Sequence, residues 1–345
     1  MKGCTLLLCV AHAAALGTLA PSKDGLLTWL GDGVANDAIY LKPSIACGGT
    51  FGVFARRAIA PGERLAIIPG HACMASRDAC DDAHGSFGAR CRAFLAAAPA
   101  DISREGTVLA ALLLHTRSGG AEAAASRARW GPLVDALPWD DRAHPLERAL
   151  VDGDEASFPA GEASLSRARV AALAARALVG DDVASHAESV CALAMVRSRA
   201  FDLSGFWSHR HMPGGARRIR EIMASGEKLP DTGADGAGRR FVLVPLADMF
   251  NHPSLTALRG LSDMDGGARF SGGQVTDACI AWSACFSASG DGAVSIHAPP
   301  DKSGVREGEE LWNWYCNTGS GAETREGRDA EGRAFVAKYG FSPLS

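Results

Sequence analysis

Apolar and polar positions divide the chain into segments with two different periods. Short runs rich in β-branched and aromatic residues occur between 47 and 70, after 241 and after 278, and these predict strands. In Cys47–Gly70, a glycine-flanked strand and a second strand, Arg64–Ile68, are separated by the turn signal Pro61-Gly62, which predicts a glycine-rich β-hairpin. The hairpin is not a phosphate loop, because no Gly-Lys-Ser/Thr ending and no helix follow its glycines.

Alanine- and leucine-rich sequence from Ser76 to about Val196 predicts a mainly helical region. Ser103 precedes the run VLAALLLHTR, which suits a buried helix. Ala163–Val179 predicts a helix partly facing solvent, and His186–Phe201 predicts a further helix. Three shorter segments have their own expectations: a short helix at Leu26–Leu30, and aromatic-anchored turns at Trp130–Leu133 and Leu137–Trp139.

The stretch Phe241–His252 begins as a strand and ends in a polar turn that carries Asp248, Asn251 and His252. A buried strand that delivers three polar side chains usually delivers them to a site, because unpaired polar groups in a core are costly. The alternative is a strand followed by an Asx-type turn, with Asn251 bonding its own backbone before Pro253. The stretch alone leaves both interpretations open.

Beyond this stretch, two further strands are expected, at Ala278–Ala288 and Ala293–Ala298, around a Ser-Gly-Asp-Gly turn. Glu307–Tyr315 predicts a turn followed by a strand rich in aromatic residues. Two glycine-bearing polar segments, Gly226–Arg240 and Asn317–Gly332, predict loops.

Composition excludes several classes of function. The 345 residues have a formal net charge of −4 and no sustained basic run, so nucleic-acid binding is not expected. The 10 cysteines include no Cys-x-x-Cys pair, and His209-x-His211 lies in a loop-like context, so no metal site is expected.

Residues 1–20 combine Lys2 with a mostly apolar run from Thr5 to Leu19, and Ala15 and Gly17 stand at signal-peptidase spacing. The run is shorter than the roughly 20 residues of a membrane span, so no span is expected. A cleaved targeting segment, for a plastid or the endomembrane system, is preferred over an ordinary N-terminal helix. The protein is otherwise expected to be intracellular.

Taken together, short motifs in this order resemble the SET-domain methyltransferases, in the branch of the Rubisco large-subunit lysine methyltransferase. The matching segments extend over most of the chain: the opening strands Gly49–Ala55 and Ala58–Pro69, the SRxF helix end Ser198–Phe201, the PxxDxxNH segment Val244–His252, the GEEL segment Gly308–Leu311 with Tyr315, and the closing Tyr339–Phe341. Each motif is weak alone, and the signal comes from their common order.

The resemblance implies an α+β fold: a β-rich SET fold of several small sheets with a C-terminal pseudoknot, divided by a mainly helical insert. The SET halves would be residues 26–75 and 241–345, and the insert region would be 76–240, including the SRxF helix. The chain ends at Ser345, just past the closing motif, so the substrate-binding domain that follows in this branch is expected to be absent.

The implied cofactor is S-adenosyl-L-methionine, and the implied reaction is in-line methyl transfer to a lysine amine of a non-histone protein. Transfer of this kind depends mainly on alignment, and on an apolar channel that favours the neutral amine. By resemblance, Tyr315 is the catalytic residue, and the substrate channel is formed by Phe201, Trp314 and Tyr339. The residues implied to bind the cofactor are Phe51, Gly52, Val53, Arg199, Asp248, Asn251, His252 and Phe341.

Two alternatives remain beside the lysine methyltransferase. One is a non-catalytic SET-like binding module, because Cys316 replaces the glycine usual after the tyrosine and the segment Asn317–Gly332 is unusually long. The other is a protein-histidine methyltransferase. Relatives with that activity tend to carry a polar side chain where Phe201 stands, which favours lysine.

Overall fold

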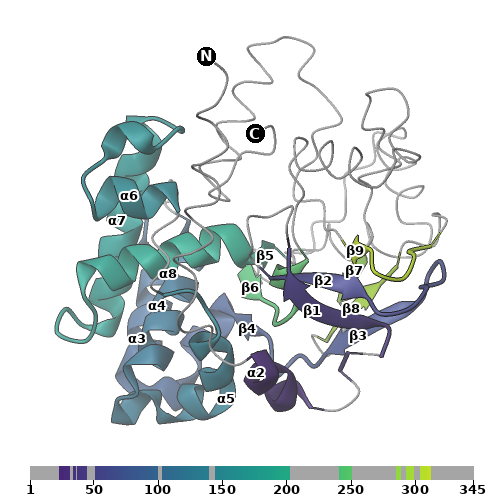
Figure 1. Cartoon of the computed structure of the whole chain (residues 1–345). Coiled ribbons are helices and arrows are strands. Elements are labelled where there is room, and N and C mark those ends of the chain that lie inside the picture. The colour runs from purple at the N-terminus through teal and green to yellow at the C-terminus, as the bar shows by residue number, and fades with distance from the viewer. Residues whose placement is uncertain are drawn as a thin grey trace, which may run out of the picture.

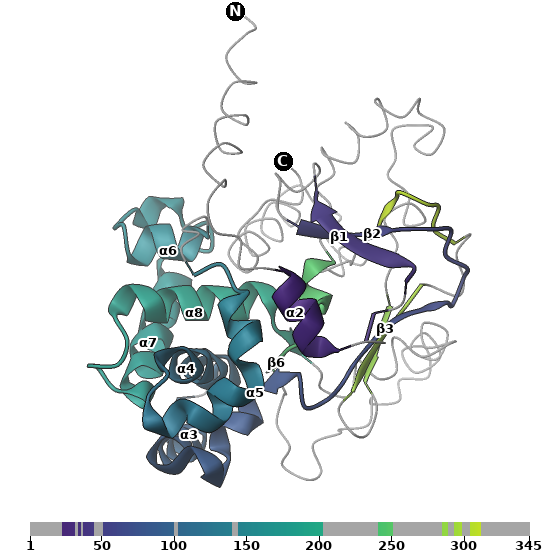
Figure 2. The same cartoon turned by 60° about the horizontal axis from the view of Figure 1, so that its bottom comes forward.

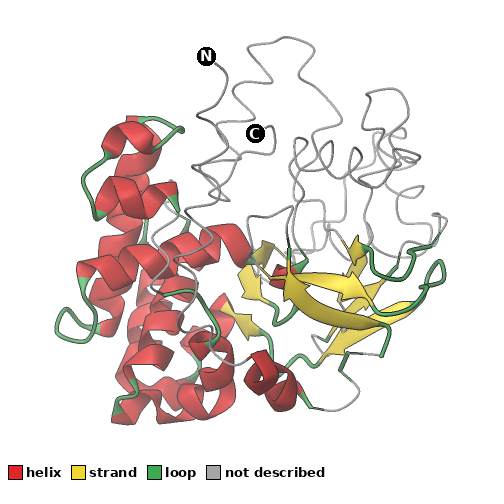
Figure 3. Cartoon of the chain, in the orientation of Figure 1, coloured by secondary structure: helices red, strands yellow, loops and turns green. Residues whose placement is uncertain are grey.

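The computed structural model describes residues 23–31, 34–35, 37–44, 51–99, 103–139, 144–202, 241–250, 285–288, 293–298 and 304–311. A layer of helices lies beside a group of small sheets (Figure 1; Figure 3), so the fold is α+β, as expected. No helix in these ranges is long and apolar enough to cross a bilayer.

The described strands form three small antiparallel sheets of three strands each. In order across each sheet they are β1 (Ile39–Pro43), β2 (Phe51–Ala55) and β9 (Glu310–Leu311); β3 (Arg64–Ile68), β8 (Val294–His297) and β7 (Cys285–Ala288); and β4 (Met74–Ala75), β6 (Phe241–Leu243) and β5 (Phe201–Asp202). Every sheet joins strands from both halves of the sequence.

The prediction of a glycine-rich hairpin is wrong, although both predicted strands are present. β3 runs from Arg64 to Ile68 as predicted, but β2 pairs with β1 and β9, whereas β3 pairs with β8. At the turn between them, Gly62 has φ +74° and its N–H bonds to the Ala298 carbonyl at 3.1 Å. The turn therefore directs the chain into a second sheet. The strands predicted at Ala278–Ala288 and Ala293–Ala298 are present where the structure describes them, as β7 and β8, and they pair with Ala288 opposite Val294.

Among the described residues, the helical layer contains six helices between residues 85 and 199 (Figure 2). A further helix, α2 (Lys23–Leu30), confirms the short N-terminal helix. The six helices are α3 (Gly85–Ala97), α4 (Arg104–Ser118), α5 (Ala124–Asp135), α6 (Pro145–Leu150), α7 (Glu162–Val179) and α8 (His186–Arg199). Short 3₁₀ turns, η1 (Ser76–Cys80), η2 (Asp82–His84), η3 (Ala121–Ala123), η4 (Glu155–Ser157) and η5 (Ala247–Met249), link or follow these elements.

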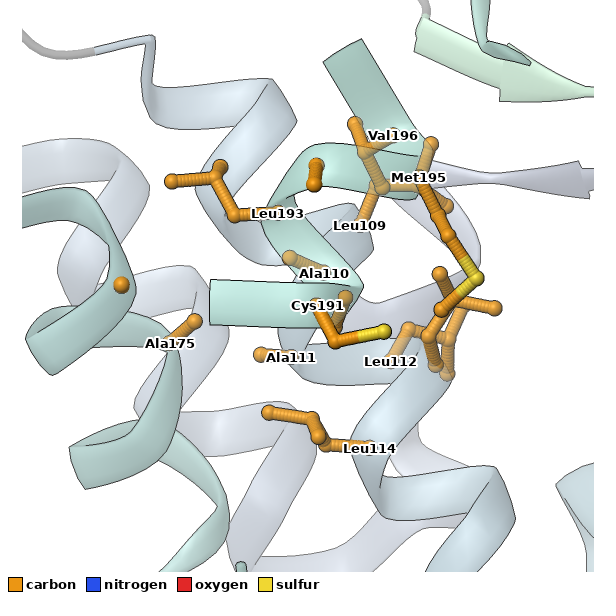
Figure 4. Close-up of a cluster of buried hydrophobic side chains, with 14 of the residues drawn as sticks. Leu109, Ala110, Ala111, Leu112, Leu114, Ala175, Cys191, Leu193, Met195 and Val196 are labelled. Carbon is orange, nitrogen blue, oxygen red and sulfur yellow. The ribbon is translucent and has the colours of Figure 1, made fainter. Parts of the chain in front are cut away.

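α4 is the central helix of this layer, and it packs against α5, α7 and α8. Its side chains are buried without interruption from Gly106 to Thr116, as the apolar run predicts. Leu109 and Leu112 of α4 lie near Met195 and Val196 of α8 in the core that these helices share (Figure 4). α7 buries one face and exposes Val170 and Leu173 on the other, which confirms a helix partly facing solvent.

Two predictions for this layer need correction. Trp130 lies inside α5 and not in a turn, because its buried indole N–H bonds to the Cys73 carbonyl at 3.2 Å and holds this segment against the core despite Pro132. The predicted helix His186–Phe201 ends two residues early, at Arg199. The next residue is extended, with φ −78° and ψ 139°, and Phe201 begins β5.

β6 connects the two hydrophobic cores of the molecule. Its Leu243 side chain belongs to the helical core, whereas Val242 and Val244 belong to the core between the sheets. This division follows from the alternation of side chains along a strand. The described part of the turn that follows β6 packs in the core between the sheets, through Leu246, Ala247 and Phe250.

Candidate functional site

The structure describes six of the twelve residues proposed for the site. Arg199, Phe201 and Asp248 are described in full, with Gly52 and Val53 of β2, and Phe51 is described through its backbone at the start of β2. The other six lie outside the described residues: Asn251, His252, Trp314, Tyr315, Tyr339 and Phe341. The described part of the site is thus its helix end and its strand ends.

An ion pair joins Arg199 to Asp248. Nη1 of Arg199, in the last turn of α8, lies 2.8 Å from Oδ2 of Asp248, in η5. The Asp248 side chain is 11% exposed and that of Arg199 is 31% exposed, so the pair is partly screened from water. Charge-assisted hydrogen bonds in such surroundings are stronger than exposed ones. Two motifs that are far apart in the sequence thus meet through their charged residues.

Strand pairing places Phe201 beside β6, the strand that precedes Asp248 in the chain. β5 begins at Phe201, directly after α8, and Phe201 lies opposite Val242 of β6. Its ring is partly buried against the core between the sheets. The pairing of β5 with β6 therefore places the end of α8, with Arg199, beside the segment that leads from β6 to Asp248 in η5.

β2 contacts the η5 turn, which brings the opening motif to the ends of the other two motifs. Val53 is fully buried in the core between the sheets and pairs with both Leu41 and Leu311. Its side chain therefore supports the site from the core side. Gly52, opposite Lys42, has no side chain, and this permits close approach to its backbone.

The residue that sequence reasoning missed is Leu246. It has φ +68° and ψ −36° and is the single non-glycine residue with positive φ in the described ranges. A leucine in this region is strained, and strain persists only where the surroundings hold it. Here the fully buried side chain anchors it, and its carbonyl accepts a hydrogen bond from the Met249 N–H at 3.0 Å. The strained turn aims Asp248, two residues later, at Arg199. Nothing in the sequence signals this.

The arrangement is suited to holding an anion. One guanidinium nitrogen of Arg199 pairs with Asp248, and a guanidinium has five N–H donors in a planar fork. The group can therefore remain paired with Asp248 while it donates to a second carboxylate. The partial exposure of Arg199 leaves it accessible to such a ligand.

Metal-ligand clusters and reactive thiols would be two other bases for a functional site in the described ranges. No group of three or more His, Cys, Asp or Glu side chains there is arranged to hold a metal ion. Burial raises the pKa of both the Cys73 and Cys91 thiols to about 12, so neither forms a nucleophilic thiolate at neutral pH. These cysteines serve as small core residues.

Comparison with solved structures identifies the fold. A crystal structure of the SET domain of LSMT bound to lysine and AdoHcy matches with a TM-score of 0.53 and 15% sequence identity, over 94% of this chain and 58% of that chain. A structure of Rubisco LSMT bound to AdoMet matches with a TM-score of 0.49 and 16% identity, over 94% and 57% of the two chains.

The chain thus has the SET-domain fold of the LSMT type, as the motifs predict, and it spans 58% of the length of the first of these structures. No family model and no curated protein matches the sequence.

Proposed function

We propose that this chain, with its SET-domain fold, is an S-adenosylmethionine-dependent protein-lysine N-methyltransferase that acts on a non-histone protein. The observation that carries the proposal is the ion pair of Arg199 and Asp248, at 2.8 Å. It unites the SRxF helix end with the PxxDxxNH segment inside a fold shared with the SET domain of LSMT. Two motifs recognised in the sequence as one family's pattern are thereby neighbours in space, and the contact of β2 with η5 brings a third beside them.

The described residues fit the cofactor at its charged end. S-adenosylmethionine carries a carboxylate and, when bound, supplies the electrophilic methyl group. Arg199 holds that carboxylate through the donors that do not bond to Asp248. Asp248 fixes the direction of the guanidinium, and Gly52 lets the cofactor approach the β2 backbone. We assign the remaining contacts to Phe51, Asn251, His252 and Phe341.

The reaction requires a neutral lysine amine in line with the methyl group. Free lysine has a pKa near 10.4, and an apolar channel lowers the free energy of the neutral amine relative to the ammonium. We assign one wall of that channel to Phe201, whose ring is partly buried beside β6. We assign Trp314 and Tyr339 to the other walls, and to the Tyr315 hydroxyl the task of orienting the amine.

Calorimetric titration of the full chain with S-adenosylmethionine tests the cofactor assignment. We expect saturable binding that Arg199→Ala and Asn251→Ala each weaken by roughly tenfold to a hundredfold, the effect of losing a hydrogen bond to a charged group. The matched control is Arg169→Ala, because Arg169 is also an ion-paired arginine but lies on α7, where it pairs with Glu155 of η4. Absence of binding by folded wild-type protein favours the non-catalytic binding module instead.

The acceptor is tested by mass spectrometry of extracts incubated with the enzyme and a labelled cofactor. We expect label on lysine, and loss of turnover with retained cofactor binding in Tyr315→Phe. Label on histidine would replace lysine as the acceptor and leave the cofactor assignment intact. Turnover unchanged in Tyr315→Phe would refute the role assigned to that hydroxyl.

A further inference from the structure

A cavity of about 390 Å³ lies in the helical layer, apart from the site around Arg199. It is bounded by the end of α4, by α6, by Trp139 and by the start of α8. The helix rise of about 1.5 Å per residue places Glu188, at the cavity, roughly 16 Å along α8 from Arg199. Its volume lies in the range of small-ligand sites, roughly 300–1,000 Å³. In Figure 1, α6 lies beside α8 at this end of the layer.

One wall of the cavity is formed by Trp139, which makes one hydrogen bond through its indole ring and one through its backbone carbonyl. The indole N–H of Trp139 donates to the Val134 carbonyl at 2.8 Å. The Trp139 carbonyl accepts from the Cys191 thiol at 3.4 Å. A ring tethered in this way offers a preformed face at little cost in side-chain entropy.

The guanidinium group of Arg117 lies over the face of the Trp139 ring. The guanidinium carbon of Arg117 lies 4.2 Å from the centre of the Trp139 ring, and its Nε lies 3.6 Å from Oε1 of Glu188. An aromatic face combined with a carboxylate is the pattern by which proteins bind organic cations. The Arg117 side chain is 36% exposed, so it can leave the ring for solvent without breaking a packed core.

Glu188 is fixed and charged. Its Oε2 accepts hydrogen bonds from the Ser185 N–H and hydroxyl, both at 2.9 Å. The backbone hydrogen bond from Ser185 lowers the pKa of Glu188, so the carboxylate is ionised at neutral pH. Once Arg117 leaves the ring, the Glu188 carboxylate and the face of the Trp139 indole remain in the lining, and both favour a cation over an anion.

We propose that this cavity binds a small organic cation, an alkylammonium or guanidinium group on a protein side chain, which displaces Arg117 from the face of Trp139. Arg117 is the internal occupant and holds the site closed in the free protein. The bound cation then pairs with Glu188 and lies over the indole ring. This site is separate from the proposed methyl-transfer site and does not depend on it.

The test is titration of the full chain with tetramethylammonium, methylguanidinium and acetate, followed by ligand-observed NMR. We expect both cations to bind and acetate not to bind. Removing the internal occupant in Arg117→Ala should tighten cation binding by about threefold to tenfold, since a cation–π contact of moderate strength is lost from the competing state. Glu188→Gln should weaken binding by a similar factor and retain the helix cap, because glutamine also serves in a capping box.

Arg129→Ala is the matched control. Arg129 also stacks on a tryptophan, Trp130, at 4.2 Å, but it does not line this cavity. Arg129→Ala removes one positive charge, as Arg117→Ala does, and it should leave cation binding unchanged. The proposal is overturned if neither cation binds the folded protein, or if Arg117→Ala changes affinity no more than Arg129→Ala does. S-adenosylmethionine binding, measured on the same variants, should not change.

Discussion

Acidification should destabilise the helical layer through a buried pair of histidines. His115 of α4 and His84 of η2 are 5% and 4% exposed. The His115 ring stacks on Phe87 at 4.1 Å, and His84 meets it edge-on at 5.6 Å. Burial, and then the charge that His84 would carry, lower the pKa of His115 from 6.5 to about 4. Burial also lowers the pKa of His84. Both rings are therefore neutral in the folded protein at pH 7.

The magnitude follows from the shift in pKa. Between pH 6.5 and pH 4 the unfolded chain binds a proton at His115 and the folded chain does not, so stability falls as the pH falls. Above pH 6.5 the residue is neutral in both states and contributes no pH dependence. A difference of about 2.5 pKa units, at about 1.36 kcal/mol each, lowers the free energy of unfolding by about 3 kcal/mol by pH 4. His84 adds to this loss in the same direction.

The assay is urea unfolding of the wild type and of His115→Gln at pH 7, 6, 5 and 4, followed by tryptophan fluorescence. Glutamine does not titrate, and its side-chain amide can donate to the Glu122 carbonyl, which lies 3.2 Å from the His115 Nε2. The variant should gain about 3 kcal/mol relative to the wild type between pH 7 and pH 4. A constant difference across that range, or an NMR titration of His115 near pH 6.5, would refute the reasoning.

Two further predictions concern the backbone, and both are measured as urea midpoints. Leu246→Val should cost about 3 kcal/mol, because a β-branched residue at positive φ adds strain to the loss of buried volume. The matched Leu243→Val, in regular β6, should cost about 1 kcal/mol, and equal losses would contradict the strain. Gly88→Ala should destabilise α3 despite alanine's higher helix propensity, because its Cβ would lie 2.4 Å from the Asp81 carbonyl oxygen. Gly120→Ala, where the nearest atom lies at 3.9 Å, should have an effect below about 0.5 kcal/mol.

Much of the local structure was determined by the sequence alone. The spacing of apolar residues located α4, α7 and the strand Arg64–Ile68. Elements that are buried on one side or completely require apolar residues at regularly spaced positions, and this spacing is visible in the sequence. The order of short motifs predicted the SET fold, and the resemblance singled out Arg199 and Asp248, which the structure joins in an ion pair. The charges and hydrogen-bonding groups of these two side chains follow from their residue types alone.

Tertiary structure decided which elements meet. The sequence of a strand does not specify which strand it pairs with. β2 and β3 are neighbours in sequence, but they pair in different sheets. Burial of Trp130 kept a Gly-Pro segment helical where local signals predict a turn. The positive φ of Leu246, the contact of Arg199 with Asp248 and the cavity under Arg117 all depend on residues distant in the chain. Their physical reason is the same: the free energy of non-local packing exceeds the local preferences that a sequence pattern records.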